Sequence, residues 1–257
     1  MHRHSPIPIG EAQVQERLAG RRILVTGAGS GIGQAVADLF LTAGAQVAAL
    51  DRQWAGNRPA PSAQFLACEA DITSPQAVEQ AVAQAADTFD GLDGVVNAAG
   101  IANTDWAEAV TLEDWKRVID VNLTGTFNVC RACLPHLCAA GAGTIVNLSS
   151  GQGLQPFKQR SAYAASKADV IAFSQGIAME WAPGVRVNTI CPGAVDTPMV
   201  RAGYSAETLR DQVGPRYALE RIGEPHEIAL AALYLSSAES SFVTGIVLAG
   251  DGGRRYH

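Results

Sequence analysis

The sequence has few charged and few aromatic residues, and its charge is predominantly negative. Charged residues make up 17% and aromatic residues 6% of the 257 residues, and the formal net charge is -6. No basic surface is therefore expected to attract a phosphate backbone, which argues against nucleic acid as a partner. Long uncharged apolar runs are also missing, so we expect neither a transmembrane helix nor a membrane partner.

Targeting signals and a disulfide framework are missing as well. The stretch 1–10 contains His and Pro but no apolar core or small-residue cleavage site, which favours a soluble cytoplasmic protein. The five cysteines lack the paired spacing of small secreted domains, so we expect thiols. Cys130 and Cys133 form a CxxC inside a helical pattern with no second Cys/His pair nearby. We interpret them as buried packing residues and expect no metal site.

Short apolar runs alternate with longer segments of helical period along the chain. The expected strands are Arg22–Thr26, Ala45–Leu50, Gln64–Cys68, Gly94–Asn97, Thr144–Leu148, Val185–Ile190 and Ile246–Leu248. Helical patterns fill most of the intervals, including 31–43 and 111–137. This alternation predicts a Rossmann-type, doubly wound α/β fold with a seven-stranded, mostly parallel sheet and helices on both faces. We expect an N-terminal extension over 1–20 and a single domain over 21–257.

A glycine-rich turn joins the first expected strand to the first expected helix. Its sequence is Thr26-Gly-Ala-Gly-Ser-Gly-Ile-Gly33. Glycines there let the backbone approach a dinucleotide pyrophosphate, and the helix N-terminus favours its negative charge. A tight turn alone would also explain the glycines, but the strand before them and the helix after them favour dinucleotide binding. The residues expected to bind it here are Gly27, Ser30, Gly31, Ile32 and Gly33.

Asp51, at the end of the second strand, is expected to select the dinucleotide. Its carboxylate can accept hydrogen bonds from an adenosine ribose and would repel a 2′-phosphate, which favours NAD over NADP. Arg52 argues the other way, because a guanidinium can pair with a 2′-phosphate. Ser30 adds no second positive charge in the glycine turn. NAD is therefore the expected cofactor, and use of NADP stays open.

Several motifs occur in one order and together resemble the short-chain dehydrogenase/reductase family. They are Thr26-xxx-Gly-x-Gly, Asn97-Ala-Ala-Gly100, Ser150 and Tyr163-Ala-Ala-Ser-Lys167. The glycine spacing is similar to that of the compact branch, and the Tyr163 to Lys167 spacing differs from the longer gap of enoyl reductases. The resemblance covers nearly the whole chain and leaves mainly the N-terminal extension and the tail 254–257 outside. It implies carbonyl or alcohol chemistry in a homotetramer, with the helices around 111–137 and 161–181 between subunits.

The same resemblance implies further cofactor contacts. Asp71 and Ile72 would lie against the adenine, residues 97–100 would support the cofactor wall, and the residues after 191 would hold the nicotinamide end. The cofactor-binding residues expected in this way are Asp71, Ile72, Asn97, Ala98, Ala99, Gly100, Tyr163, Lys167, Pro192, Gly193, Val195 and Thr197.

Tyr163 is the expected acid/base. Oxidising an alcohol removes a hydride from carbon and a proton from oxygen, so a base must lie beside the nicotinamide. Lys167, one helical turn away, is expected to lower the pKa of the tyrosine. An isolated pair at this spacing would more often be a solvated helix face. The dinucleotide motif and Ser150 favour the catalytic interpretation.

Ser150 and Asn122 complete the catalytic set that the resemblance implies. Ser150 would polarise the substrate oxygen; the neighbouring Ser149 is the competing choice, and strand-end or turn hydrogen bonding is its alternative role. Asn122 would connect Lys167 to solvent through a water-mediated proton path, or it would be a satisfied core amide. A dinucleotide-binding regulator without catalysis is the alternative function, and the complete catalytic set argues against it.

The substrate is the least determined part of the prediction. Gln152 and Arg160 resemble carboxylate-binding positions of 3-hydroxybutyrate dehydrogenases, so a small hydroxy acid is one hypothesis. In the alternative, Lys158 and Arg160 are surface charges and Phe157 packs. A cyclic polyol, a dihydrodiol or a hydrophobic secondary alcohol is then an open alternative. The expected substrate residues are Ser150, Gln152, Arg160 and Tyr163.

Overall fold

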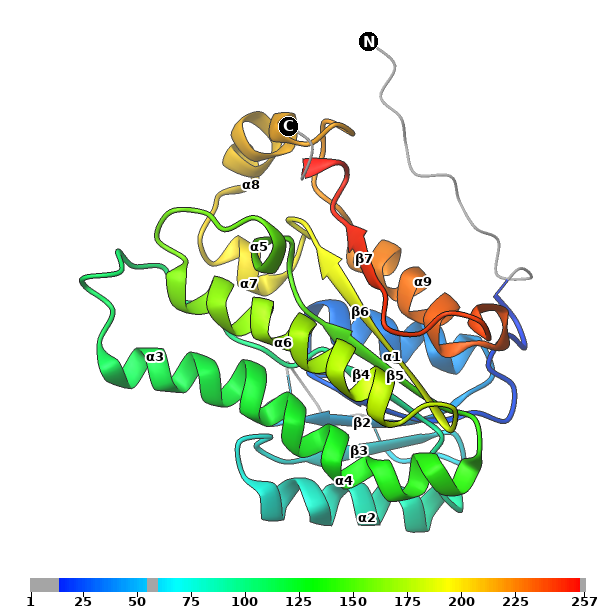
Figure 1. Cartoon of the computed structure of the whole chain (residues 1–257). Helices are drawn as coiled ribbons and strands as arrows, with labels where there is room; N and C mark the ends of the chain where they lie inside the picture. Colours follow the sequence, from blue (N-terminus) through cyan, green and yellow to red (C-terminus); the bar gives the residue numbers. More distant parts are fainter. Residues whose placement is uncertain (1–13, 55–59, 255–257) are drawn as a thin grey trace.

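The computed structural model describes residues 14–54 and 60–254 and contains one parallel sheet (Figure 1). The 7-stranded sheet has the order β3-β2-β1-β4-β5-β6-β7, and all neighbouring strands are parallel. The strands are β1 (Arg22–Thr26), β2 (Gln46–Asp51), β3 (Phe65–Glu69), β4 (Gly94–Asn97), β5 (Gly143–Leu148), β6 (Val185–Pro192) and β7 (Val247–Gly250). The strand order reverses between β1 and β4, as in doubly wound α/β folds. The predicted fold class is confirmed.

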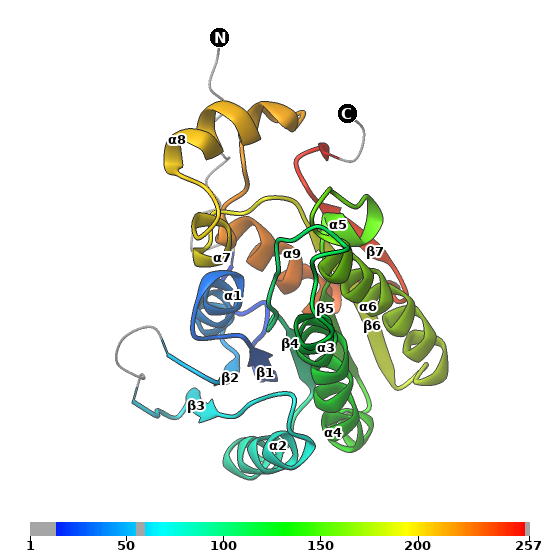
Figure 2. The same ribbon diagram turned by 90° about the vertical axis from the view of Figure 1, so that its left-hand side faces the viewer.

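Helices cover both faces of the sheet (Figure 2). One face carries α1 (Gly31–Thr42) and α9 (Pro225–Ser236), which pack against each other, and the other carries α2 (Pro75–Phe89), α4 (Gly125–Ala140) and α6 (Ser161–Glu180). Because both faces are covered, the strands are buried on both sides. Leu24 and Val25 point to opposite faces and are both 0% exposed.

Shorter elements connect this framework. α3 (Leu112–Ile119) leads into α4 through the π-helical turn η2 (Asp120–Thr124), α5 (Gly151–Leu154) follows β5, and η5 (Ala238–Ser240) follows α9. The elements α7 (Pro198–Arg201), α8 (Ala206–Thr208), η3 (Leu209–Val213) and η4 (Gly214–Arg216) follow β6, and we call residues 198–216 the cap segment. In Figure 1, α7 lies beside the end of β6 toward which the strand points, and α8 lies beyond that end.

The helical pattern over 111–137 is not one continuous helix, which corrects the sequence-based expectation. Thr111 caps α3 as expected, since its side chain accepts a hydrogen bond of 3.0 Å from the Asp114 N–H. The α-helical turn then widens into η2. Asn122 lies in this turn and is bonded to the backbone of Ile101, a residue of another segment. Single π turns inside helices are frequent at functional sites.

The N-terminal residues that the structure describes pack against the domain. Val14 and Leu18 are buried on the α1 side of the sheet, and the Leu18 N–H donates to the Ala43 carbonyl at 2.9 Å. Residues 14–20 are therefore part of the same folded body, whereas 1–13, 55–59 and 255–257 lie outside the described residues. The division into an extension and a single domain over 21–257 stays a prediction.

The described ranges contain no membrane-spanning helix, no disulfide and no cluster of metal-binding side chains. No helix there is long and apolar enough to cross a bilayer. The five cysteines all lie in these ranges and form no disulfide. Cys130 and Cys133 are 0% exposed, and burial raises the pKa of Cys130 to about 12, so it stays a neutral thiol. No group of His, Cys, Asp and Glu in the same ranges could hold a metal ion.

Candidate active site

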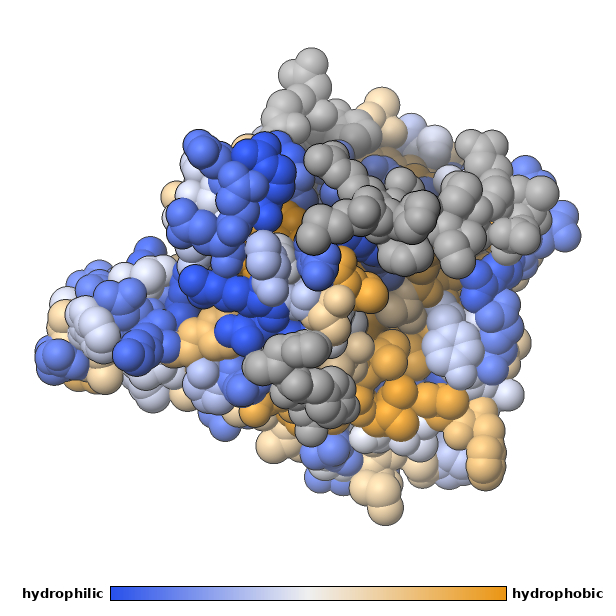
Figure 3. All heavy atoms as spheres, turned by 90° about the horizontal axis from the view of Figure 1, so that it is seen from above, coloured by the Kyte–Doolittle hydropathy of each residue, from blue (hydrophilic) through white to orange (hydrophobic). Residues whose placement is uncertain are grey.

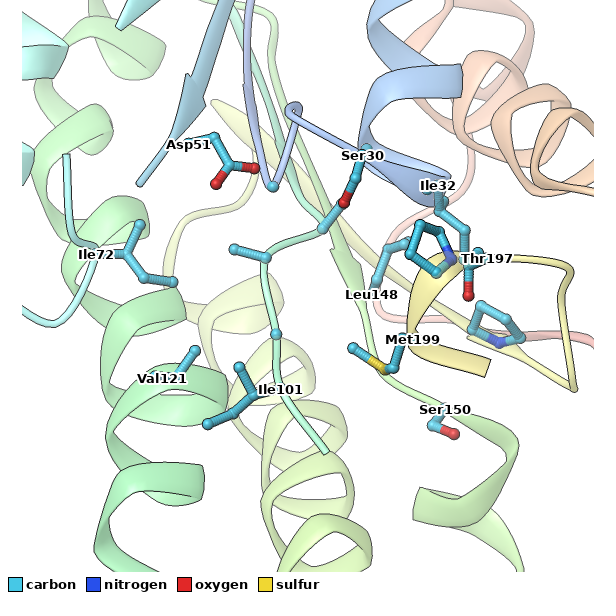
Figure 4. Close-up of a pocket in the computed structure, with 18 of the residues that line it drawn as sticks. Ser30, Ile32, Asp51, Ile72, Ile101, Val121, Leu148, Ser150, Thr197 and Met199 are labelled. Atoms are coloured by element: carbon cyan, nitrogen blue, oxygen red, sulfur yellow. The ribbon is translucent and has the colours of Figure 1, made fainter. Parts of the chain in front are cut away.

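A cavity of about 370 Å³ lies where the strand order reverses. Its walls come mainly from the residues at and after the ends of β1, β2, β3, β4, β5 and β6. In Figure 4, Asp51 and Ser150 lie at opposite ends of the cavity, with Ile72 and Thr197 on facing walls. Crevices at this point of doubly wound sheets bind ligands, because the loops after neighbouring strands diverge there.

The glycine turn after β1 is shaped for close backbone approach. Gly27 has φ +69°, and a Cβ there would lie 2.7 Å from the Ala99 nitrogen; a Cβ at Gly33 would lie 2.2 Å from the Gly27 carbonyl oxygen. Ser30, the N-cap of α1, makes no side-chain cap hydrogen bond. The first N–H groups of α1 are thus left for another acceptor, and a helix N-terminus favours an anion. These features fit the pyrophosphate of a dinucleotide.

Carboxylates shape the end of the cavity beside β2. Asp51 Oδ2 accepts a hydrogen bond of 2.8 Å from the Gly29 N–H, which fixes the carboxylate at the edge of the glycine turn. Arg52 is turned toward Asp71, with 3.7 Å between Nη1 and Oδ2, and its side chain is 66% exposed. Burial raises the pKa of Asp71, but hydrogen bonds from Thr73 and the Arg52 charge outweigh burial and lower it. The Arg52 charge is therefore partly neutralised by Asp71.

All but one of the predicted cofactor-binding residues line this cavity. They are Gly27, Ser30, Gly31, Ile32, Gly33, Asp51, Arg52, Asp71, Ile72, Ala98, Ala99, Gly100, Tyr163, Lys167, Pro192, Gly193, Val195 and Thr197. Asn97 does not line it: the residue is 3% exposed, and its Nδ2 donates to Asn147 Oδ1 at 2.8 Å between neighbouring strands. Side chains alternate across a strand, so Asn97 supports the wall from behind and contacts its neighbour strand instead.

A second cavity of about 200 Å³ adjoins the first. Its walls come from α5 and the connection to α6, from the cap segment and from the residues after β7. The residues that line both cavities are Ser150, Tyr163, Pro192, Gly193, Met199 and Val200. The predicted substrate residues Gln152 and Arg160 line the second cavity. Tyr163 and Ser150 therefore stand where a dinucleotide-sized cavity meets a smaller one.

Ser150 is the serine that contacts Tyr163. Burial raises the pKa of Tyr163, while a hydrogen bond with Ser150 and the charge of Arg160 act to lower it. The competing Ser149 donates instead to the Lys167 carbonyl at 2.7 Å and is 4% exposed. Its hydroxyl is thus committed to the backbone of α6, as expected of a strand-end residue.

Lys167 reaches a different partner from the one expected. Its Nζ donates to the Leu148 carbonyl at 2.9 Å and lies 6.0 Å from the centroid of the Tyr163 ring. The i, i+4 spacing does place both side chains on one face of α6, but the ammonium is directed to the end of β5. Burial keeps the pKa of Tyr163 above its ordinary value, and the charge that opposes this effect comes from Arg160. Burial lowers the pKa of Lys167 to about 8.

Asn122 is fully buried in η2 with its amide satisfied. Oδ1 accepts from the Ile101 N–H at 2.8 Å, and Nδ2 donates to the Ile101 carbonyl and to Ser166 Oγ, both at 2.9 Å. The same amide lies close to Lys167, because a Cβ added at Gly100 would be 3.2 Å from both Asn122 Oδ1 and Lys167 Nζ. Asn122 is thus a satisfied amide that lies near the lysine, and the water-mediated proton path stays a prediction.

Sequence reasoning missed several residues that line the cavities. They are Ile101, Arg117, Val121 and Leu148 in the first cavity and Tyr217, Asp251 and Arg254 in the second. These residues belong to no short motif and come together only through the tertiary fold. The one available signal was the run Asp251-Gly-Gly253, which fits the family pattern, while Arg254 lies just beyond it.

The fold and the two joined cavities define an oxidoreductase that binds a nicotinamide dinucleotide. Over residues 27–255 the chain matches the family described as enoyl-(acyl carrier protein) reductase. The chain belongs to the short-chain dehydrogenase/reductase family.

Similar proteins of known activity include dehydrogenases of several alcohols. The 2-(R)-hydroxypropyl-CoM dehydrogenase of Xanthobacter autotrophicus is 36% identical over 247 residues, which cover 90% of this chain and 97% of the relative. The D-threitol dehydrogenase of Mycolicibacterium smegmatis is 39% identical over 249 residues, covering 92% and 94%. The structure of Thermoplasma acidophilum aldohexose dehydrogenase superimposes with a TM-score of 0.89 at 33% identity, covering 95% and 97%. The chain is accordingly an oxidoreductase that acts on CH–OH groups.

Proposed function

We propose that the protein transfers a hydride between NAD(H) and a secondary alcohol or ketone, with Tyr163 as acid/base. The observation that carries the proposal is the place of Tyr163 and Ser150 at the junction of the two cavities. A substrate in the smaller cavity would have its reacting carbon next to the end of the larger one. Bound in the larger cavity, the nicotinamide would supply or accept the hydride at that carbon.

The side chains at the junction would move the proton. Tyr163 would take the proton from the alcohol oxygen in oxidation and return it to the carbonyl oxygen in reduction. Ser150 Oγ, which already contacts Tyr163, would hydrogen-bond the same oxygen while charge develops on it. Arg160 would assist, because its positive charge favours the phenolate form of the tyrosine.

Lys167 and Asn122 would complete the proton path. With a pKa of about 8, Lys167 is mostly charged at neutral pH, so it would stabilise negative charge at the bottom of the site. Asn122, close to the ammonium at Gly100, would position it and the backbone at Ile101. A water beside these groups would then carry the proton from Tyr163 toward solvent.

NAD is the cofactor that the β2 end of the cavity supports best. Asp51 is held by the Gly29 N–H at the edge of the glycine turn, where it can accept hydrogen bonds from ribose hydroxyls. A 2′-phosphate would meet this negative charge, and Arg52 is already paired with Asp71. An NADP-dependent carbonyl reductase is the alternative.

A small hydroxy acid is the substrate hypothesis that the second cavity supports. Gln152 and Arg160 both line it, and Arg160 Nη1 donates to the Asn103 carbonyl at 2.9 Å, which orients the guanidinium. The competing view of Arg160 as a surface charge fits less well, because the side chain is partly buried. Lys158, by contrast, is exposed at the same cavity.

We extend the proposal to a cytoplasmic homotetramer. Leu112, Phe127 and Met179, on the helices expected between subunits, are 76%, 43% and 82% exposed, and they supply apolar surface that association of subunits would cover. Cysteines that form no disulfide are typical of proteins in reducing compartments. Sedimentation of the dilute protein tests the assembly, and a stable, fully active monomer would contradict it.

The decisive test of the reaction is turnover of a panel of hydroxy acids, sugars and aromatic alcohols by wild type and Tyr163→Phe. Wild type should oxidise members of the panel with NAD. Tyr163→Phe should lower kcat by about 10²- to 10⁴-fold. It should still bind NAD, so that NAD changes the protein fluorescence of the variant as it does that of wild type. Tyr234→Phe, an exposed tyrosine outside both cavities, is the matched control and should stay within about two-fold of wild type. Full activity of Tyr163→Phe would overturn the proposal, and an inactive wild type that binds NAD would support the regulator instead.

A further inference from the structure

The second cavity is positively charged although the chain as a whole is negative. Lys158, Arg160, Arg216 and Arg254 line it, and Asp251 is the acidic residue in its wall. The formal net charge of the chain is -6. Figure 3, seen from above the end of β6, shows hydrophilic side chains gathered over one part of this face next to hydrophobic ones. Charge of one sign in a cleft raises the local concentration of ligands of the opposite sign.

Most arginines in the described ranges pair with a carboxylate, and those of this cavity do not. Ion pairs are formed by Arg17, Arg21, Arg22, Arg52, Arg117, Arg131, Arg201, Arg210 and Arg221. Within the same ranges, Arg160, Arg186, Arg216 and Arg254 have no such partner. Arg186 instead donates to the carbonyls of three residues, and the other three line the second cavity. The arginines left for an external anion are therefore concentrated there.

Arg254 is the best placed of these cations to bind an anion. Its Cζ lies 4.7 Å from the centroid of the Phe157 ring, and the side chain is only partly exposed. Stacking holds a guanidinium on its face and leaves the N–H groups at its edge for a planar or tetrahedral oxyanion. Burial raises the pKa of Tyr217 and the charge of Arg254 opposes this effect. The positive charge of Arg254 is therefore felt at Tyr217, another residue that lines the second cavity.

A further polar group of the wall lacks a partner. The Oε1 atom of Gln152 is buried and has no hydrogen-bond partner in the described part of the chain. A buried polar atom without a partner is unfavourable. A ligand in the cavity could satisfy the amide in either orientation, since one end accepts and the other donates. Gln152 and the unpaired cations therefore both point to a polar occupant.

We propose that the second cavity selects secondary alcohols and ketones that carry an oxyanion, a carboxylate, sulfonate or phosphate, and that Arg254 is its main anchor. Arg160, beside Tyr163, adds positive charge at the reacting end. The volume of about 200 Å³ limits the occupant to a small molecule. The inference rests on the proposed hydride transfer. It differs from the hydroxy-acid hypothesis in placing the anion on Arg254 and in admitting oxyanions other than carboxylate.

The substrate test compares matched anionic and neutral alcohols with NAD. The anionic probes are 3-hydroxybutyrate, 2-hydroxypropane-1-sulfonate and 2-hydroxypropyl phosphate, and the neutral ones are 3-hydroxybutanamide, 2-hydroxypropane-1-sulfonamide and 1-methoxypropan-2-ol. For at least one pair, kcat/KM should be about ten-fold or more higher for the anion at low salt, and the preference should shrink as NaCl is added. The pair that shows the preference identifies the oxyanion.

Variants of Arg254 test whether this residue binds the anionic group of the substrate. Arg254→Gln should raise KM for the preferred anion about ten-fold or more and leave its neutral counterpart unchanged, while Arg254→Lys should retain part of the preference. Arg210→Gln is the matched control: it removes an arginine of the cap segment that pairs with Asp211 and lines neither cavity. It should leave both KM values unchanged.

The outcomes separate this inference from the proposed function. Turnover of neutral probes as fast as anionic ones, or an equal effect of Arg254→Gln on both, would overturn the anion preference and leave hydride transfer intact. Absence of turnover with every probe and either cofactor would count against the proposed function itself. Independently of turnover, inorganic sulfate should raise the Tm of wild type and of Arg210→Gln more than that of Arg254→Gln. Equal shifts in all three proteins would overturn the assignment of Arg254.

Discussion

The two cavities that meet at Tyr163 are built from different parts of the chain. The larger one is formed largely by backbone at the ends of six strands, including a glycine turn in which added atoms would collide. The smaller one is formed by side chains on connections and on the cap segment, and some of them, such as Lys158 and Arg216, are exposed. Backbone shape is tied to the fold, whereas these side chains can change without disturbing it. The reaction therefore follows from motifs, and the substrate does not.

Gly33→Ala tests the backbone-built cavity and is expected to have the largest effect. A Cβ at this position would lie 2.2 Å from the Gly27 carbonyl oxygen, so α1 or the turn must shift. We expect a loss of about 3 kcal/mol or more in the free energy of unfolding, or at least a 100-fold loss of NAD affinity where the variant folds. Urea unfolding followed by circular dichroism and a fluorescence titration with NAD measure the two effects.

The control for Gly33→Ala is Gly176→Ala. This glycine lies in α6, and a Cβ there meets nothing within 4 Å. Alanine is a better helix former than glycine, so the free energy of unfolding of this variant should rise by up to about 1 kcal/mol. If Gly33→Ala bound NAD and unfolded like Gly176→Ala, the close approach at the turn would not limit the cavity, and the contrast between the two cavities would fail.

The parts of the structure that were predictable are those with a local pattern. β1 and β4 lie at the expected bounds Arg22–Thr26 and Gly94–Asn97, because strands covered on both faces are continuous apolar runs between turns. The π turn η2 was not predictable, because it depends on hydrogen bonds between Asn122 and the backbone of Ile101. Helical periodicity over 111–137 carries no sign of such a contact between distant segments.

The site shows the same division between local pattern and tertiary contact. The spacing of Tyr163 and Lys167 correctly placed them on one helix face, but the direction of the Lys167 ammonium depends on the end of β5, which no spacing on α6 encodes. The role of Arg160 as the charge beside the tyrosine depends on the fold of the α5 to α6 connection. Arg254 reaches the second cavity only because β7 ends beside β6.

Lys167→Met tests a buried charged group of the larger cavity through the pH dependence of stability. Burial lowers the pKa of Lys167 in the folded protein to about 8, from an ordinary value of 10.5. Between these values the unfolded chain binds more protons, so the contribution of Lys167 to stability rises with pH. Below pH 8 the folded protein carries the full cost of burying the ammonium. Between pH 7.5 and pH 10.5, the free energy of unfolding of wild type should therefore rise by about 3 kcal/mol relative to that of Lys167→Met.

Urea unfolding of both proteins at fixed protein concentration across this pH range measures the change. Lys116→Met, which removes an exposed lysine of α3, is the matched control. Because no buried charge is removed, its free energy of unfolding should follow that of wild type across this pH range. A constant difference in the free energy of unfolding between wild type and Lys167→Met would show that the ammonium is well solvated. The proposal that a buried Lys167 ammonium stabilises negative charge at the bottom of the site would then lose its basis.

Asp51→Asn sharpens the comparison between the two cavities. At the β2 end, the choice of cofactor in the larger cavity is expected to depend on a charged side chain and not on backbone shape. The amide oxygen of asparagine can still accept the Gly29 N–H bond that Asp51 accepts, so the glycine turn should keep its shape. The variant loses the negative charge that would repel a 2′-phosphate. We expect the ratio of kcat/KM with NADP to that with NAD to rise about ten-fold, with stability unchanged within about 1 kcal/mol.

Asp38→Asn controls for net charge, since Asp38 is exposed on α1 and lines neither cavity. It should leave the cofactor ratio as in wild type. An equal ratio in Asp51→Asn and Asp38→Asn would mean that Arg52, despite its pairing with Asp71, already neutralises this end of the cavity. A ten-fold shift confined to Asp51→Asn would show that cofactor choice, like substrate choice, is decided by a charged side chain on a scaffold that backbone packing has fixed.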